Sequence, residues 1–155
     1  MSTCKFPLPC GRSTIVDTAD LHLLIGYNWH ADKRPHTVYV RGRLPGQHKG
    51  GVYLHFLIVG GRADHKDGDG LNNSRSNIRP CTQKQNTWNK AVKKGKPFKG
   101  VYLRGNSYWT QIYADGKSYY SGGHKSAEAA ALAYDVLALQ LHGDFARLNF
   151  PRPAP

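Results

Sequence analysis

Short stretches in which hydrophobic and polar residues alternate recur along this chain, and they predict a protein rich in strands. Residues 13–16 favour a short strand, and residues 27–31 and 37–44 favour a hairpin that turns at 32–35. The alternation returns over residues 98–121. Because a period of two sends successive side chains to opposite faces, each strand is expected to have one apolar and one polar face.

Two segments lack this pattern. The first twelve residues contain Pro7, Pro9 and Gly11, which interrupt regular structure, so an irregular lead-in is expected. Residues 90–97 hold four lysines, a glycine and a proline. They are expected to end the preceding helix and to form a basic linker.

Helical spacing appears before and after the predicted hairpin. A short helix is predicted to begin at Thr18 or Asp20, and the spacing of Thr82 and Gln85 as a capping box predicts another that begins at Thr82. The run 52–59, VYLHFLIV, fits a strand or a short helix equally well. The apolar face of the first helix is expected to be Leu21, Leu24 and Ile25.

The composition adds a strong positive charge. The 155 residues carry a net charge of +12, most of it before Pro97. Such a field attracts polyanions and favours salt-dependent binding to DNA. There is neither an apolar run of the ~18 residues that span a bilayer nor the apolar core of a secretory signal. We therefore expect nucleic acid as the partner, no membrane, and a cytoplasmic location.

The cysteines number three, Cys4, Cys10 and Cys81, without C-x-x-C spacing. Reduced thiols are expected in a cytosolic protein. A zinc site that combines them with some of the eight histidines is the alternative.

The stretch 62–90 carries the most specific chemistry. The pair Asp64 and His65 precedes a turn-rich loop, and Asn86 lies one turn into the helix predicted to begin at Thr82. Hydrolysis of a phosphodiester needs a base for the attacking water and a cation for the developing charge. A neutral imidazole can act as the base, and a carboxylate with an amide oxygen suits Mg²⁺ or Mn²⁺.

This stretch resembles the HNH nuclease family, in particular its phage homing-endonuclease branch. That branch reads Asp-His, then Asn-Asn, then Ser-Asn-Leu-Arg, then a helix ending in Gln-Asn. The counterparts here are Asp64-His65, Asn72-Asn73, Ser76-Asn77-Ile78-Arg79 and Gln85-Asn86. The resemblance also favours a helix over residues 52–59, in which His55 is expected to be a packed, hydrogen-bonded core residue rather than a catalyst.

The resemblance implies a role for each of these polar residues. His65 would be the general base, Asp64 and Asn86 would bind the metal, and Asn77 would tether the loop and orient the histidine. Adjacent residues of a strand face opposite ways, so the strand must end or bulge at Asp64-His65 if both serve one site.

Basic residues near this stretch are expected to contact phosphates. Arg79 and Lys90 flank the predicted catalytic helix, whereas Arg41 and Arg43 project with Tyr39 from one face of the strand at 37–44. For the strand, a merely solvated face is the alternative.

Residues beyond Pro97 predict a unit of three strands and one helix. Asp115-Gly116 marks a tight hairpin turn, and Ser126 is expected to cap a helix of about four turns that ends at His142-Gly143. The helix is expected to cover one face of the sheet with Ala129, Leu132, Ala133, Val136 and Leu137.

This unit resembles the plant ethylene-response-factor (Apetala-type) DNA-binding domain over nearly its full length. The matching residues include Lys99-Gly100-Val101, Trp109, Ser126 to Ala130, Ala133-Tyr134-Asp135 and residues 142–151. In that family the exposed sheet face lies in the major groove, with more arginines than are present here. The resemblance implies a DNA-facing set of Lys99, Tyr102, Arg104, Gln111, Tyr113 and Tyr120. For the tyrosines, cross-strand packing is the alternative.

Together these patterns predict an α+β protein. It has a β-rich segment at residues 1–60, a ββα-metal (HNH) nuclease core at 61–94, and a three-stranded antiparallel sheet packed on one helix at 98–151. The predicted function is metal-dependent, site-directed DNA cleavage of the homing type, which yields a 3′-hydroxyl and a 5′-phosphate. One catalytic set per chain favours a monomer that nicks one strand. The alternatives are a catalytically inactive, sequence-specific DNA-binding regulator and, less suited to a groove-reading unit, an RNA-cleaving enzyme.

Overall fold

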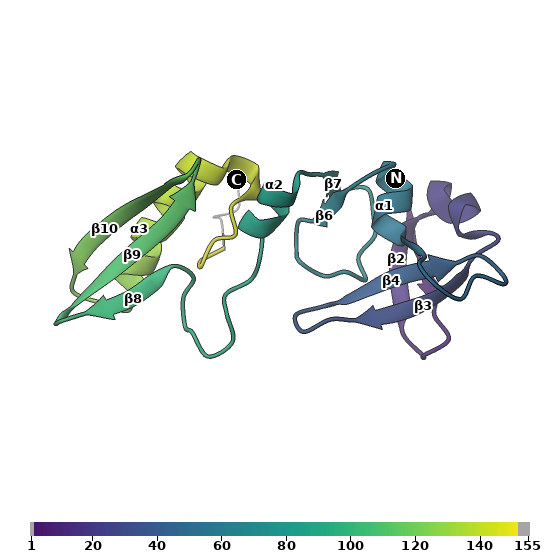
Figure 1. Ribbon diagram of the computed structural model, residues 1–155, viewed down its shortest axis with the longest axis horizontal. Coiled ribbons are helices and arrows are strands. Elements are labelled where there is room, and N and C mark those ends of the chain that lie inside the picture. The colour runs from purple at the N-terminus through teal and green to yellow at the C-terminus, as the bar shows by residue number, and fades with distance from the viewer. Residues whose placement is uncertain (1, 152–155) are drawn as a thin grey trace. The chain divides into compact units, whose positions relative to one another are not determined.

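The computed structural model describes residues 2–151, which form two compact units (Figure 1). Unit 1 ends at Asn86 and unit 2 begins at Thr87. Each unit combines helices with small antiparallel sheets, in agreement with the predicted α+β class. No helix in the described range has the length and apolar character needed to cross a membrane.

Unit 1 contains several short strands joined by short helices. Its first sheet pairs β1 (Thr3–Pro7) with β2 (Ser13–Asp17), its second has the order β3 (Asn28–Lys33), β4 (Val38–Arg43), β5 (Val52–Tyr53), and its third pairs β6 (Ala63–His65) with β7 (Ile78–Pro80). The helices are the 3₁₀ helix η1 (Thr18–Leu24), α1 (Leu54–Val59) and α2 (Gln83–Trp88), the last of which crosses the boundary between the units.

The prediction of an irregular lead-in was wrong, because β1 (Thr3–Pro7) lies within it. Pro7 is the last residue of β1 and pairs with Ser13. A proline is tolerated there because β1 is an edge strand and the missing N–H lies at its end. Cys4 and Phe6 alternate with more exposed neighbours and pack against the core.

A shared core joins the N-terminal hairpin to the rest of unit 1. Val16 of β2, Val40 of β4 and Leu54 of α1 are fully buried in one cluster. Trp29 also packs there, since a Cβ at Gly42 would overlap its ring. Consequently β2, the sheet β3–β4–β5 and α1 share one hydrophobic core.

The helix predictions for unit 1 were mostly confirmed. Residues 54–59 are helical, and a short helix does begin at Thr18. Ile25 was wrongly assigned to its buried face: η1 ends at Leu24, Ile25 is extended, and its side chain is 78% exposed. Strand β3 also runs two residues into the predicted turn and ends at Lys33, and the hairpin closes where the Arg34 N–H donates to the Thr37 carbonyl.

Unit 2 is a sheet covered on one face by a helix (Figure 1). The sheet has the order β10 (Lys117–His124), β9 (Ser107–Ala114), β8 (Val101–Arg104). It is followed by α3 (Ala127–His142) and a 3₁₀ turn, η2 (Gly143–Phe145). Ser126 caps α3 as predicted, with its hydroxyl accepting a hydrogen bond from the Ala129 N–H.

The buried face of α3 was predicted only in part, since Leu137 packs against the core of unit 2 as expected. Leu132 and Val136 were expected to cover the sheet, yet each is 56% exposed. Small side chains are buried against the sheet instead, together with the ring of Tyr134. Apolar residues occur all round this helix, so their spacing did not distinguish the two faces. The buried alanines are Ala130, Ala131 and Ala138.

Helix α2 ends at Trp88, well before Gly95, where it was predicted to stop. The Lys99 ammonium donates to the carbonyls of Trp88 and Lys90. A lysine that captures the last carbonyls of a helix stabilises its end, so Lys99 supports this early termination.

The C-terminal segment is fastened by one carboxylate. Asp135 accepts hydrogen bonds from the backbone N–H groups of Asn149 and Phe150 and from the Asn149 amide. The Asn149 side chain also bonds both backbone groups of Lys99. The segment that ends the described chain is thereby tied to α3 and to the approach to β8.

Substituting Gly100 by Ala should destabilise unit 2 more than the same change at Gly105. Both glycines have positive φ, +72° and +60°, so both substitutions strain the backbone. Only the Cβ at position 100 would overlap the Tyr134 ring, whereas nothing lies within 4 Å at position 105. The overlap should cost a further 1–3 kcal/mol or so, roughly the cost of overpacking. Free energies of unfolding from denaturant titration would check this, and equal losses would contradict it.

Candidate active site

The loop between β6 and β7 is drawn together by Asn77. The Asn77 carboxamide oxygen accepts from the Asp67 N–H at 3.1 Å, and its amide donates to the Asp67 carboxylate and the Asn72 carbonyl at 2.9 and 2.7 Å. These bonds join the two ends of the loop. They fit the predicted tethering role of Asn77, which stays a prediction.

Strand β2 and helix η1 hold the loop from outside. The Ile15 N–H donates to the Leu71 carbonyl, and the Asn73 N–H donates to the Ile15 carbonyl. Arg75, further along the loop, forms an ion pair of 2.6 Å with the buried Asp20, and its N–H donates to Asp17. The N-terminal residues thus position the loop next to the candidate catalytic strand.

His65 is buried at the end of β6. Its side chain is 4% exposed, and its Nε2 lies 3.2 Å from the carboxamide oxygen of Asn73. Burial lowers the pKa of His65 below its ordinary value, opposed by the Asn73 hydrogen bond and by nearby carboxylates. The imidazole is therefore neutral at neutral pH and able to accept a proton.

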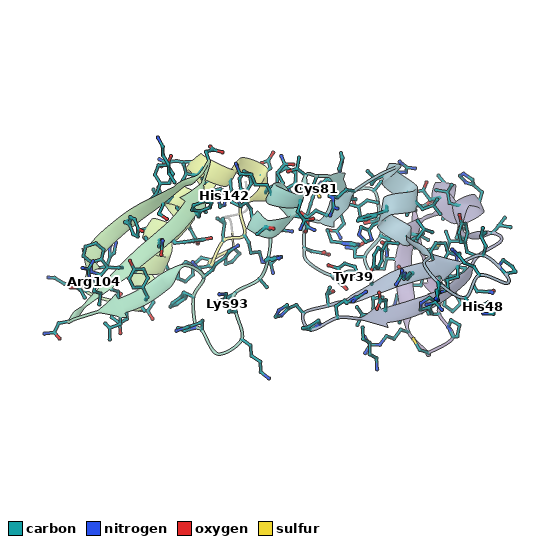
Figure 2. The ribbon with its side chains drawn as sticks, viewed as in Figure 1. Tyr39, His48, Cys81, Lys93, Arg104 and His142 are labelled. Carbon is teal, nitrogen blue, oxygen red and sulfur yellow. The ribbon has the colours of Figure 1, made fainter. Side chains whose placement is uncertain are left out.

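A second imidazole, His55, packs against His65, an arrangement that sequence reasoning missed. The ring centroids are 4.4 Å apart, and Tyr39 (labelled in Figure 2) lies within 5.8 Å of both rings. Burial, and secondarily His65, lowers the pKa of His55 to about 3. His55 is packed as expected, but its buried Nδ1 has no hydrogen-bond partner among residues 2–151. No local sequence signal places it beside His65.

Asp64 is paired with Arg79 on the neighbouring strand. The guanidinium Nη2 and Nε lie 2.9 and 3.2 Å from one carboxylate oxygen, and Asp64 is only 6% exposed. Asp64 thus faces Arg79 while His65 faces the aromatic cluster, and β6 ends at His65. The predicted metal ligand and the predicted phosphate contact are therefore partners in this structure.

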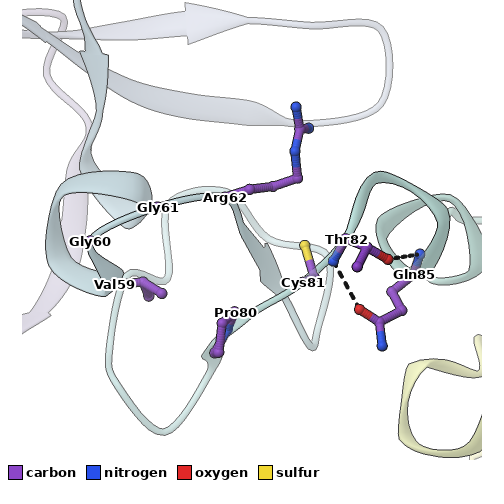
Figure 3. A pocket seen from close by; sticks show the side chains of 8 residues that line it. All are labelled: Val59, Gly60, Gly61, Arg62, Pro80, Cys81, Thr82 and Gln85. Carbon is purple, nitrogen blue, oxygen red and sulfur yellow. Dashed lines mark hydrogen bonds between the residues drawn. The ribbon is translucent and has the colours of Figure 1, made fainter.

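Asn86 lies one turn into α2, as predicted. The capping box is confirmed, since Thr82 and Gln85 exchange two hydrogen bonds (Figure 3). Asn86 is half-buried, and no hydrogen bond to its carboxamide is found in residues 2–151. With Asp64 it offers the oxygen chemistry that suits a hard divalent cation.

A metal would need further ligands beyond these two residues. Within the described chain, no group of three or more His, Cys, Asp or Glu side chains is arranged to hold an ion. Mg²⁺ commonly completes its shell with water and phosphate oxygens. The three cysteines are free thiols. Cys81 instead lines a pocket of about 450 Å³ at the end of α1 (Figure 3), together with Arg62 and the capping box.

The predicted phosphate contacts differ in how far their side chains are already engaged: those of β4 contact other residues of the protein, and those of the loop after α2 are exposed. The Arg41 guanidinium lies over the Tyr53 ring at 5.5 Å, and Arg43 donates to the Gly50 carbonyl. Lys90 is exposed, and Lys93 points away from the same loop (Figure 2). The arginines are partly engaged, whereas the loop lysines are open to a ligand.

Lys99 does not extend from the sheet as its place in the predicted DNA-facing set requires. Its ammonium bonds the carbonyls at the end of α2, and burial lowers its pKa to about 8, with a smaller effect from Arg147. Its position supports a structural role.

The remaining members of that set gather on the sheet face opposite α3. Tyr113 and Tyr120 are 60% and 55% exposed, and the Gln111 amide donates to the Tyr120 hydroxyl. Arg104, at the end of β8 (Figure 2), lies 5.3 Å above the Trp109 ring, which pairs across the strands with Tyr102. We call these residues the aromatic sheet face: Tyr102, Arg104, Trp109, Gln111, Tyr113 and Tyr120.

Two known proteins resemble the chain. "Uncharacterized HNH endonuclease L560" of Acanthamoeba polyphaga mimivirus is 31% identical over 131 residues, which cover 79% of this chain and 67% of the viral protein. "Ethylene-responsive transcription factor ERF010" of Arabidopsis thaliana is 38% identical over 66 residues, 41% of this chain and 36% of the plant protein. No family model matches the chain, and neither does any solved structure.

The buried His55 should make unit 1 sensitive to acid. An unfolded histidine has a pKa of ~6.5, whereas folding holds that of His55 at about 3. Below about pH 6.5 the His55 imidazole therefore binds a proton in the unfolded chain but stays unprotonated in the folded chain. The stabilisation is complete above that pH and falls by up to about 1.4 kcal/mol per pH unit on acidification.

Comparing His55→Phe with the wild type would isolate this effect. The variant keeps a ring but loses the titrating nitrogens, so its free energy of unfolding should fall less steeply between about pH 7 and pH 5. Denaturant titrations in EDTA would measure both slopes. His48→Gln, at an exposed histidine, should match the wild type. Identical slopes for all three proteins would contradict the prediction.

Proposed function

The chain belongs to the HNH endonuclease family, and we propose from this premise that it is a metal-dependent DNA endonuclease. It would hydrolyse a phosphodiester to a 3′-hydroxyl and a 5′-phosphate. The observation that carries the proposal is His65, a buried neutral imidazole held by Asn73 at the end of the strand that also carries Asp64. The net charge of +12 favours a polyanionic substrate.

His65 acts as the general base in this proposal. Its ring takes the proton of the attacking water, and the P–O3′ bond breaks as the new P–O bond forms. Asp64 and Asn86 are the oxygen donors that would hold Mg²⁺ or Mn²⁺, and the bound ion would stabilise charge on the phosphate and on the leaving oxygen. Arg79, already next to Asp64, offers its guanidinium to the same phosphate.

Unit 2 would direct cleavage to particular DNA sites. Its aromatic sheet face is exposed and alternates with the face buried by α3, a geometry that lets side chains enter a groove. The partial likeness to a plant transcription factor supports this role. With one catalytic set per chain, we propose a monomeric, homing-type enzyme that nicks one strand of double-stranded DNA.

An inactive DNA-binding regulator is the second candidate, and the Asp64–Arg79 ion pair favours it. A carboxylate held by a guanidinium at 2.9 Å binds a cation less readily. Such a protein would bind DNA but would leave it intact in Mg²⁺ and in Mn²⁺. Conversion of supercoiled plasmid to the open-circular form, with and without EDTA, therefore separates the two candidates.

His65→Ala should abolish plasmid nicking and leave DNA affinity within a few-fold of the wild type. Loss of a general base costs ~10²–10⁴ in rate, whereas His65 is buried and contributes little charge to DNA binding. EDTA should stop nicking by the wild type, and Mg²⁺ or Mn²⁺ should restore it. His48→Ala is the matched control at an exposed histidine. Normal nicking by His65→Ala would reject the mechanism.

Replacing Tyr113 and Tyr120 together by Ala should reduce site selectivity without lowering the rate on random DNA. Each contact to a base is worth ~1–3 kcal/mol, so the ratio of specific to random cleavage should fall at least tenfold. Leu132→Ala, at a similarly exposed residue on the opposite side of unit 2, is the control. Mapping nicks on a plasmid with the native site would measure the ratio. Full selectivity in the double variant would place recognition elsewhere.

A further inference from the structure

A chain of hydrogen bonds links the Leu71 carbonyl through Thr14 and Asn73 to His65. The donor and the acceptor of each bond can be assigned, starting from the carbonyl. A backbone carbonyl can only accept. The Thr14 hydroxyl lies 2.7 Å from the Leu71 carbonyl, so its single proton is donated there. The Thr14 oxygen therefore accepts the hydrogen bond that links it, at 2.8 Å, to the side chain of Asn73.

The orientation of the Asn73 amide follows from this direction. The atom that faces Thr14 also lies 3.2 Å from the Gly70 carbonyl, so it meets two acceptors and must be the amide nitrogen. The opposite amide orientation would place an oxygen against both. The carboxamide oxygen of Asn73 consequently faces Nε2 of His65, at 3.2 Å.

We propose that Thr14 and Asn73 are positioning residues that fix neutral His65 as its Nε2–H tautomer. The Asn73 oxygen can only accept, so Nε2 must carry the ring proton. Nδ1 is then the nitrogen with the lone pair, and, if the proposed endonuclease function holds, it is the atom that accepts the proton of the attacking water. Thr14 acts only through Asn73.

Burial makes this chain of bonds hard to replace. Thr14 and Asn73 are both fully buried, and His65 nearly so. A buried polar group that loses its partner stays unsatisfied. A solvent-exposed imidazole exchanges between its tautomers. Here the Nδ1–H tautomer is disfavoured, because it would set the lone pair of Nε2 against the Asn73 oxygen and leave that oxygen without a donor. The hairpin strand β2 thus selects the chemical form of a side chain that is 51 residues further along the chain.

Nitrogen NMR of the full chain, labelled with ¹⁵N-histidine and kept metal-free with EDTA, tests the proposal directly. At a pH where the ring is neutral, the two ring nitrogens give distinct shifts for each tautomer. The His65 signal is assigned by its loss in His65→Gln. We expect the Nε2–H tautomer with a slowly exchanging ring proton, and exposed His48 is the internal control for fast exchange. An Nδ1–H tautomer for His65 would overturn the proposal.

Variants at Thr14 test this relay, the pair of hydrogen bonds that joins Thr14 to Asn73 and Asn73 to His65, without changing the catalytic residue. Thr14→Ser keeps the hydroxyl and should preserve both the tautomer and the slow exchange. Thr14→Val removes the acceptor for Asn73, so the His65 ring proton should exchange faster and kcat should fall about tenfold or more, less than the ~10²–10⁴ for loss of the base itself, with KM for DNA unchanged. If Thr14→Val matches Thr14→Ser in both readouts, the relay is refuted.

The tautomer and the proposed function can fail separately. The NMR signal reports the ring proton whether or not the chain cleaves DNA. An Nε2–H ring in a chain that cleaves nothing would support the tautomer and reject the nuclease. An Nδ1–H ring in an active nuclease would overturn the tautomer alone.

Discussion

A polar loop can be packed inside a protein only if its donors and acceptors all find partners, and this constraint governs unit 1. The segment between β6 and β7 is rich in Asp, Asn, Ser and Gly, and burying such groups without hydrogen bonds costs several kcal/mol. Asn77 satisfies part of the loop from within, and residues of β2 and η1 supply further partners. The hydrophobic core holds these partners together, because it includes Val16 of β2, Leu24 of η1 and Ile78 of β7.

The same burial sets the electrostatics of the candidate site. Packing His55 and His65 ring to ring makes a positive charge on either costly, so both stay neutral. Asp64 is equally buried, and it forms an ion pair of 2.9 Å with Arg79. The site thus places a neutral imidazole next to a carboxylate that is paired with a guanidinium, and all of these groups are shielded from water.

Signals between residues close in the sequence were enough to predict helix caps and hairpin turns. The capping box at Thr82, the Ser126 cap and the hairpins follow from near neighbours, and the structure confirms them. Burial that depends on distant residues was not readable. Strand β1 needs β2 and the core to outweigh its proline, and α3 turns its alanines inward because of the sheet it meets. His55 and Thr14 approach the candidate base only after folding, and whether the assigned site residues perform their roles stays a prediction.

The hydrogen bonds from β2 to the loop also limit how this protein can be rearranged. A catalytic stretch of about thirty residues is short enough to suggest a cassette, a segment that recombination could move intact between genes. Here the cassette would leave behind Thr14, Ile15, Asp17 and Asp20, which hold its loop. A graft into a foreign scaffold would therefore have to carry the N-terminal hairpin with it, and inheritance of the nuclease should follow the whole of unit 1.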